Sequence, residues 1–169
     1  MFVLGIDPGL TRCGYGLVAR EDGASACTAK AAGTLETDRG LPVEQRLFEL
    51  MAGLRELMVE LRPHTVVVER LFFQTNARTA TGVAQASGVA LACAVEHGCA
   101  VAQYTSNEVK LAIVGYGAAT KQQVQTMVAR QVGLPEVPSP DAADALALAL
   151  CHLVGSSLRA AVATAEARR

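Results

Sequence analysis

The sequence has no tryptophan, few aromatic residues of any kind, and no long apolar run. Three Tyr and four Phe make up 4% of its 169 residues, so small aliphatic side chains must build the core. The longest stretch without a charge, Thr79 to Val95, has 17 residues and includes the polar Thr81, Gln85 and Ser87. A membrane-spanning helix needs about 20 apolar residues. We therefore expect no membrane segment and interpret this stretch as a buried helix.

Paired cysteine motifs and a signal peptide are also missing. The five cysteines are an odd number, and none belongs to a CxxC or CxxH pair, which argues against a zinc cage and a disulfide framework. We expect reduced core thiols at Cys13, Cys27, Cys93, Cys99 and Cys151. The first residues carry no basic segment and reach Asp7 too early for a signal peptide, which predicts a cytoplasmic protein.

The charge balance is close to neutral, and by itself it suggests no polyanionic partner. Lys and Arg number 15 against 16 Asp and Glu, for a net charge of -1. The charges are unevenly distributed, because residues 70–134 contain five basic and two acidic residues, a local charge of +3. Two divalent cations would add +4 to the total of -1 and give +3, a balance compatible with nucleic acid.

The hydrophobic fraction of 51% and the length of 169 residues fit one compact domain. Apolar and β-branched runs predict three consecutive antiparallel strands followed by two more strands, at residues 1–7, 14–19, 24–37, 65–68 and 99–104. Helical periodicity and capping residues predict helices over 41–62, 79–97, 106–115, 121–132 and 141–154. The order indicates an α/β fold, a five-stranded mixed sheet flanked by helices on both faces. Residues 155–169 show no core pattern and are expected to form a flexible tail behind a domain of residues 1–154.

Acidic residues occupy positions where a solvating side chain is not expected. Asp7 and Glu69 each end an apolar strand, and Asp141 and Asp144 share one face of an Ala/Leu helix at a spacing of i, i+3. Four carboxylates drawn together would repel one another, so their clustering requires cations. Oxygen-only ligands select hard ions, which predicts Mg²⁺ or Mn²⁺.

Each acid taken alone also has an ordinary structural explanation. Asp7 precedes a Pro-Gly break and can cap a turn, Glu69 can pair with Arg70 or Arg78, and Asp141 can cap its helix. The combination of two strand-end acids with a helical pair favours the metal site.

Four strings carry a resemblance to a known family: GIDPGLTRCGYG at 5–16, VVVERLFFQTNART at 66–79, VKLAIVGYGAATKQQVQTMV at 109–128 and DAADALALAL at 141–150. In combination and in register over residues 1–154, they resemble the RuvC family of Holliday junction resolvases. The resemblance implies an RNase H-like fold and a homodimer in which each subunit cuts one of two symmetric strands of four-way junction DNA. It makes Asp7, Glu69, Asp141 and Asp144 the catalytic metal ligands, for a pair of Mg²⁺ or Mn²⁺ ions in each subunit. Hydrolysis would leave a 5′-phosphate and a 3′-hydroxyl.

The same resemblance implies DNA contacts and further partners. Lys110 and Lys121 match positions that contact the DNA backbone, although such lysines taken alone are more typical of a solvated surface. Phe72 corresponds to an aromatic that stacks on an unpaired base, while Phe72 and Phe73 together would also suit a core. Arg78 is a possible phosphate contact. The RuvA and RuvB proteins are expected partners in branch migration.

The predicted helix over 79–97 carries a face of small residues that fits two explanations. The face is ordinary core packing, or, as the resemblance implies, it is the dimer interface. Its members are Gly82, Ala86, Val89, Ala90 and Cys93.

Three other functions compete with junction resolution. The string GIDPGLT followed by a hairpin is also similar to the phosphate loop of actin-like and sugar-kinase phosphotransferases, but those enzymes clamp a nucleotide between two such domains and 169 residues supply one. A scaffold that binds junctions without hydrolysis has little need for four converging acids. An RNase H-like hydrolase of RNA–DNA hybrids is the nearest alternative, and Mg²⁺-dependent nicking of a synthetic junction distinguishes it.

Overall fold

One mixed sheet of five strands organises the computed structural model, which describes residues 1–21, 23, 24, 26–70 and 77–166, with side chains at all of these except 77–79 and 156–166. The strand order is β3-β2-β1-β4-β5. The antiparallel part consists of β1 (Phe2–Asp7), β2 (Arg12–Ala19) and β3 (Thr28–Glu36). Running parallel to β1 are β4 (Thr65–Glu69) and β5 (Ala100–Tyr104). The predicted strands are therefore present with small shifts at their ends.

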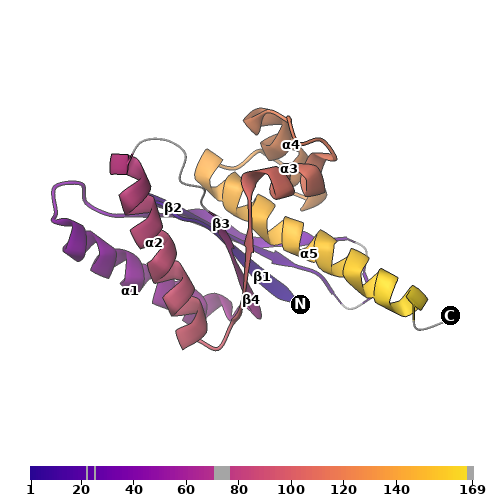
Figure 1. The fold of residues 1–169 in the computed structure, drawn as a ribbon, viewed down its shortest axis with the longest axis horizontal. Coiled ribbons are helices and arrows are strands. Elements are labelled where there is room, and N and C mark those ends of the chain that lie inside the picture. Colours follow the sequence, from indigo (N-terminus) through magenta and orange to yellow (C-terminus); the bar gives the residue numbers. More distant parts are fainter. Residues whose placement is uncertain (22, 25, 71–76, 167–169) are drawn as a thin grey trace.

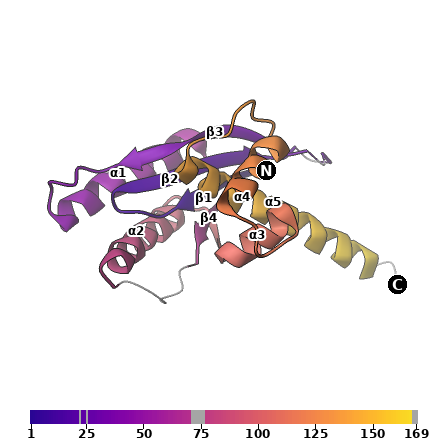
Figure 2. The same cartoon turned by 90° about the horizontal axis from the view of Figure 1, so that it is seen from above.

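Helices cover both faces of this sheet (Figures 1 and 2). One layer consists of α1 (Val43–Leu61) and α2 (Ala77–Glu96), and the other of α3 (Ser106–Val114), α4 (Lys121–Gln131) and α5 (Pro140–Glu166). The predicted α/β fold with helices on both faces is confirmed. Among the described residues, none of the helices combines the length and the apolar character needed to cross a membrane.

Alternation along β1 decides which side chain meets which helix layer. Leu4 and Ile6 pack with α1 and α2, whereas Val3 packs with α3, α4 and α5. Gly5 also faces α5, since a Cβ added there would lie 1.9 Å from the carbonyl oxygen of Ala145. The same alternation directs Asp7, the last residue of β1, to the α5 face.

Glycines on β2 allow α5 to approach the sheet closely. A Cβ added at Gly14 would lie 2.1 Å from the carbonyl oxygen of Asp141, and one at Gly16 would lie 2.7 Å from Cγ of Leu146. Any larger residue at these positions would displace the helix, so the glycines fix the distance between α5 and the strands beneath it.

Side-chain caps begin the two short helices of the α5 layer. Thr120 accepts a hydrogen bond from the backbone N–H of Gln123 and caps α4, as predicted. The cap of α3 is Thr105, one residue before the predicted Ser106, because Thr105 and Glu108 bond each other's backbone N–H in a reciprocal capping box. These caps place the first residues of both helices beside the sheet.

Three of the five small residues on the α2 face belong to the core of this chain. Ala86 and Ala90 are fully buried and Cys93 nearly so, in the cluster that α1 and α2 form with the sheet. Of the two explanations, core packing therefore holds for these three residues, whereas Gly82 and Val89 are only partly buried, and the dimer interface stays a prediction.

The predicted end of α5 near Val154 is also wrong. The helix continues to Glu166, and Figure 1 shows its last turns running beyond the sheet. The extension has a local cause, because residues 158–166 are rich in Ala and contain no Gly or Pro. That the fold of residues 1–154 does not require this segment stays a prediction.

Candidate active site

Two neighbouring parallel strands deliver acids to the same edge of the sheet. Asp7 ends β1 and Glu69 ends β4, and the pairing of Ile6 with Val68 brings these two positions side by side. Asp144, on the second turn of α5, lines the same cavity of about 420 Å³. The rest of its lining comes from α3, α4 and α5, namely Ser106, Val109, Lys110, Lys121, Val124, Ala147 and Leu148.

The acids of this cavity disfavour one another's ionisation. Burial raises the pKa of Asp7 to about 7, and the charges of Asp144 and Glu69 add to this effect, while Lys121 opposes it. Burial and the charge of Asp144 also raise the pKa of Glu69. Among the described residues, the basic side chains therefore do not offset the mutual repulsion of these acids. A bound cation would offset it.

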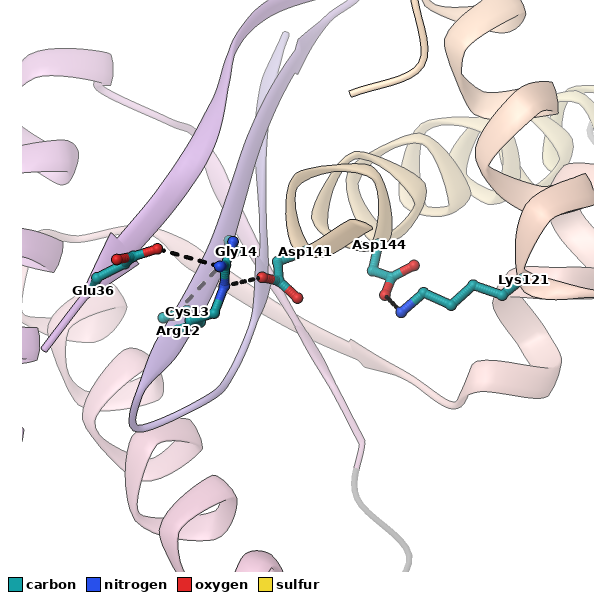
Figure 3. Close-up of polar contacts among 7 residues, drawn as sticks. All are labelled: Arg12, Cys13, Gly14, Glu36, Lys121, Asp141 and Asp144. Atoms are coloured by element: carbon teal, nitrogen blue, oxygen red, sulfur yellow. Dashed lines mark hydrogen bonds and ion pairs between the residues drawn. The ribbon is translucent and has the colours of Figure 1, made fainter. Parts of the chain in front are cut away.

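Two basic side chains reach the acids of α5 from opposite sides (Figure 3). Lys121 Nζ lies 2.5 Å from Asp144 Oδ2, inside the cavity. On the other side, Arg12 Nε donates to Asp141 Oδ2 at 2.7 Å, and a terminal nitrogen of Arg12 lies 3.4 Å from Glu36 Oε1. The pKa of Lys121 is raised by its hydrogen bond to Asp144.

The four predicted acids are thus not equivalent. Asp7, Glu69 and Asp144 line the cavity, whereas Asp141 does not and is bonded to Arg12. As the described side chains are arranged, no group of three or more His, Cys, Asp and Glu residues is placed to hold a metal ion. The charge of Asp141 still reaches Asp7 and contributes to the rise of its pKa.

The donor set suits a hard divalent cation. Only carboxylate oxygens supply anionic donors to the cavity lining, and such oxygens are the ligands that Mg²⁺ and Mn²⁺ prefer. The histidines are engaged elsewhere: His64 accepts from the N–H of Phe2, His97 contacts the carbonyl of Cys93, and His152 bonds Tyr104. Nearby Cys13 is buried, which raises the pKa of its thiol to about 12 and keeps it protonated.

The predicted DNA-binding residues divide into two groups. Lys110 and Lys121 line the cavity with the acids, where a phosphate would meet them. Phe72 lies outside the described residues, and Arg78 belongs to α2, with its side chain outside the described part.

Arg12 is the residue of this site that the sequence did not reveal. It is 129 residues from Asp141 along the chain, and no motif links them. The one available signal for its place near α5 is its spacing on β2. Arg12 lies two residues before Gly14, so both residues face α5.

An RNase H-like fold with acids at the ends of β1 and β4 and on α5 defines the class of RNase H-like nucleases. A family model described as crossover junction endodeoxyribonuclease RuvC matches residues 3–152. The chain belongs to the RuvC family. The family match also overturns the phosphotransferase interpretation.

Known relatives cover most of the chain. The RuvC of Leifsonia xyli subsp. xyli is 52% identical over 152 residues, which is 89% of this chain and 72% of that protein. The RuvC of Salinispora arenicola is 49% identical over 172 residues, or 100% and 98% of the two chains. Thermus thermophilus RuvC, solved in complex with Holliday junction substrate, superimposes with a TM-score of 0.87 at 37% identity over 94% and 96% of the chains.

In the absence of divalent cations, we expect Asp7 to make the protein less stable as the pH rises from about 4 to about 7. The pKa of Asp7 rises from 3.8 to about 7 on folding, so the folded protein keeps a proton that the unfolded chain has released. Bound protons then favour the folded state, and the free energy of unfolding falls with pH. A rise of this size corresponds to at most about 4 kcal/mol.

Thermal unfolding in EDTA between pH 4 and pH 8 measures this effect for the wild type and for Asp7→Asn. The variant cannot titrate at this position, so its melting temperature is expected to exceed that of the wild type increasingly as the pH rises. If the melting temperatures of the two proteins change in parallel with pH, Asp7 is not the source of this instability.

Proposed function

We propose that this chain resolves four-way DNA junctions by metal-dependent hydrolysis of one phosphodiester in each of two symmetric strands. The observation that carries the proposal is the cavity in which Asp7, Glu69 and Asp144 meet Lys110 and Lys121. Acids that bind cations and lysines that bind phosphates are both required by a nuclease, and here they share one cavity. Membership of the RuvC family supports the junction as substrate.

Asp7, Glu69 and Asp144 would hold the cations, with Asp141 joining them from the first turn of α5. We propose two Mg²⁺ or Mn²⁺ ions in each subunit. When bound, such ions would supply an activated water and charge stabilisation for the departing oxygen, and the expected products carry a 5′-phosphate and a 3′-hydroxyl.

The chain's own groups position the substrate. Asp7 and Glu69 are held by paired strands, so the carboxylates keep a fixed separation while DNA binds. Lys110 and Lys121 come from two capped helices and present their ammonium groups to a phosphate at the cavity. Lys121 also neutralises part of the acidic charge that would repel the DNA.

Two symmetric cuts require two sites, which supports the predicted homodimer. The face available for a second copy includes the outer sides of α1 and α2, where Phe48 is 65% and Val95 68% exposed. Cooperation with RuvA and RuvB and a cytoplasmic location remain parts of this proposal, carried by the resemblance to the family.

A synthetic four-way junction, with the two opposite strands labelled differently, tests the activity. We expect paired nicks, with ligatable ends, in the presence of Mg²⁺ or Mn²⁺ and none in EDTA. An RNA–DNA hybrid of matched length is the control substrate. Cleavage of the hybrid with an intact junction would replace the proposal by the RNase H-like alternative.

Lys121→Ala is expected to weaken junction binding and to reduce the salt dependence of binding. Loss of one phosphate contact lowers the slope of log K against log salt by about 1. Binding isotherms over a salt series measure this slope, and Arg130→Ala, an equal loss of charge at the far end of α4, is the control. If both variants show the same slope as the wild type, Lys121 makes no phosphate contact.

A further inference from the structure

One carboxylate of α5 is held outside the cavity by an arginine. Arg12 stands at the start of β2, across from Glu36 in the strand pairing, and its Nε donates to Asp141 Oδ2 at 2.7 Å. Asp144, three residues further along α5, lines the cavity, and Asp141 does not. Figure 3 shows both side chains leaving the same side of the helix, Asp141 toward Arg12 and Asp144 toward Lys121.

The two basic partners therefore have opposite effects on their carboxylates. Lys121 itself lines the cavity, so its contact keeps Asp144 in the cavity. Arg12 and Asp141 are both absent from the cavity lining, so this contact engages the Asp141 carboxylate outside the lining. Among the described residues of the site, Arg12 is the basic residue that binds the one predicted metal ligand outside the cavity lining, Asp141.

The position of Asp141 is fixed by its backbone as well as by this contact. Gly14 lies against the carbonyl of Asp141, where an added Cβ would be 2.1 Å away, and Gly14 and Arg12 share one face of β2. The main chain of Asp141 thus stays beside the site while its carboxylate turns to Arg12. From this position the charge of Asp141 still acts on Asp7, so the two carboxylates belong to the same region of the structure.

We propose that Arg12 is a positioning residue that competes with a divalent cation for Asp141, and that it transfers to Glu36 when the cation binds. This inference rests on the proposed function. The contact is easily reversed, because the Arg12 side chain is 48% exposed and exposed ion pairs are weak. Glu36, 3.4 Å from Arg12 and 63% exposed, is already in place to accept the released guanidinium.

Charge decides the sign of the expected effect. A guanidinium bonded to Asp141 both occupies an oxygen and repels an incoming divalent cation. Arg12 could also favour cation binding, if its contact held the Asp141 carboxylate in the cavity lining. Asp141 is not part of that lining. Removal of Arg12 should therefore strengthen cation binding rather than weaken it.

Equilibrium Mn²⁺ binding, followed by calorimetry and by the electron paramagnetic resonance of free Mn²⁺, tests the proposal without DNA or turnover. Arg12→Gln is expected to raise Mn²⁺ affinity about three- to fivefold, as the release of an exposed ion pair allows. The gain should vanish when Asp141→Asn is also present. Glu36→Gln should have the opposite effect, a loss of about two- to threefold, because Arg12 then has no second partner.

Arg130→Gln is the control, since it removes the same charge from the exposed end of α4 and should leave Mn²⁺ affinity unchanged. Circular dichroism and thermal melts establish that each variant is folded, and Glu36→Gln tests the idea separately if Arg12→Gln is not. Unchanged or weaker Mn²⁺ binding by a folded Arg12→Gln protein overturns the proposed role of Arg12 and leaves the proposed metal site standing. If the wild type binds no Mn²⁺, or binds it equally well with Asp7→Asn in place, both this inference and the proposed metal site are overturned.

Discussion

Replacing Asp7 with Asn is expected to abolish strand cleavage while the folded protein still binds a four-way junction. Asp7 ends the central strand β1 and lies between the charges of Glu69 and Asp144, so its loss removes the acid that the others surround. Asn has almost the same volume and keeps the packing. We expect the nicking rate to fall by about 10³-fold or more, a loss typical of removing a main electrostatic contributor.

Single-turnover nicking of a labelled junction measures the rate, and a gel-shift titration in Ca²⁺ measures binding. Asp38→Asn is the matched control, because it removes one carboxylate from an exposed turn after β3. Full nicking activity of Asp7→Asn would refute the assignment of the site. Loss of junction binding by a folded variant would mean that Asp7 acts in recognition rather than in hydrolysis.

Gly5→Ala is expected to produce the largest loss of stability. The added methyl group would lie 1.9 Å from the carbonyl oxygen of Ala145 and 3.0 Å from the backbone nitrogen of Ala149. Both are main-chain atoms of α5, so the helix or the strand has to move, and the surrounding core is closely packed. Overpacking of this kind costs about 3 kcal/mol or more, which corresponds to a melting temperature lower by about 6–12 °C.

Gly88→Ala is the control for this substitution, and it should have the opposite sign. Gly88 lies in α2, is exposed, and has no atom within 4 Å of the position of an added Cβ. Alanine in a helix is more stable than glycine by about 1 kcal/mol. Thermal melts of the two variants give the comparison, and a Gly5→Ala protein as stable as the wild type would show that α5 can retreat without cost.

Most of the fold was predictable because its signals are local. The run Thr65–Val68 predicts a buried strand, the spacing of Leu50, Leu54 and Leu57 predicts the inner face of α1, and Thr120 predicts the start of α4. The convergence of Asp7 and Glu69 also followed, since acids at the ends of parallel neighbours meet at one edge.

Contacts between distant segments were not predictable in the same way. Nothing in the sequence near Arg12 indicates Asp141 as its partner, and the close packing of Gly14 under α5 is a property of the assembled layers. The small-residue face of α2 fitted an internal or an external partner equally well, and the structure assigns Ala86 and Ala90 to the internal one by their burial. The length of α5 was underestimated because residues 158–166 have helix propensity without an apolar periodicity.

The separation of the acids along the sequence has a consequence for folding. Asp7 belongs to β1 and Asp144 to α5, so the cavity that they line forms only when α5 has packed on the sheet. A chain cut between β5 and α5 would lack two acids and the central helix of one layer. We therefore expect a partly folded chain without docked α5 to have no nicking activity.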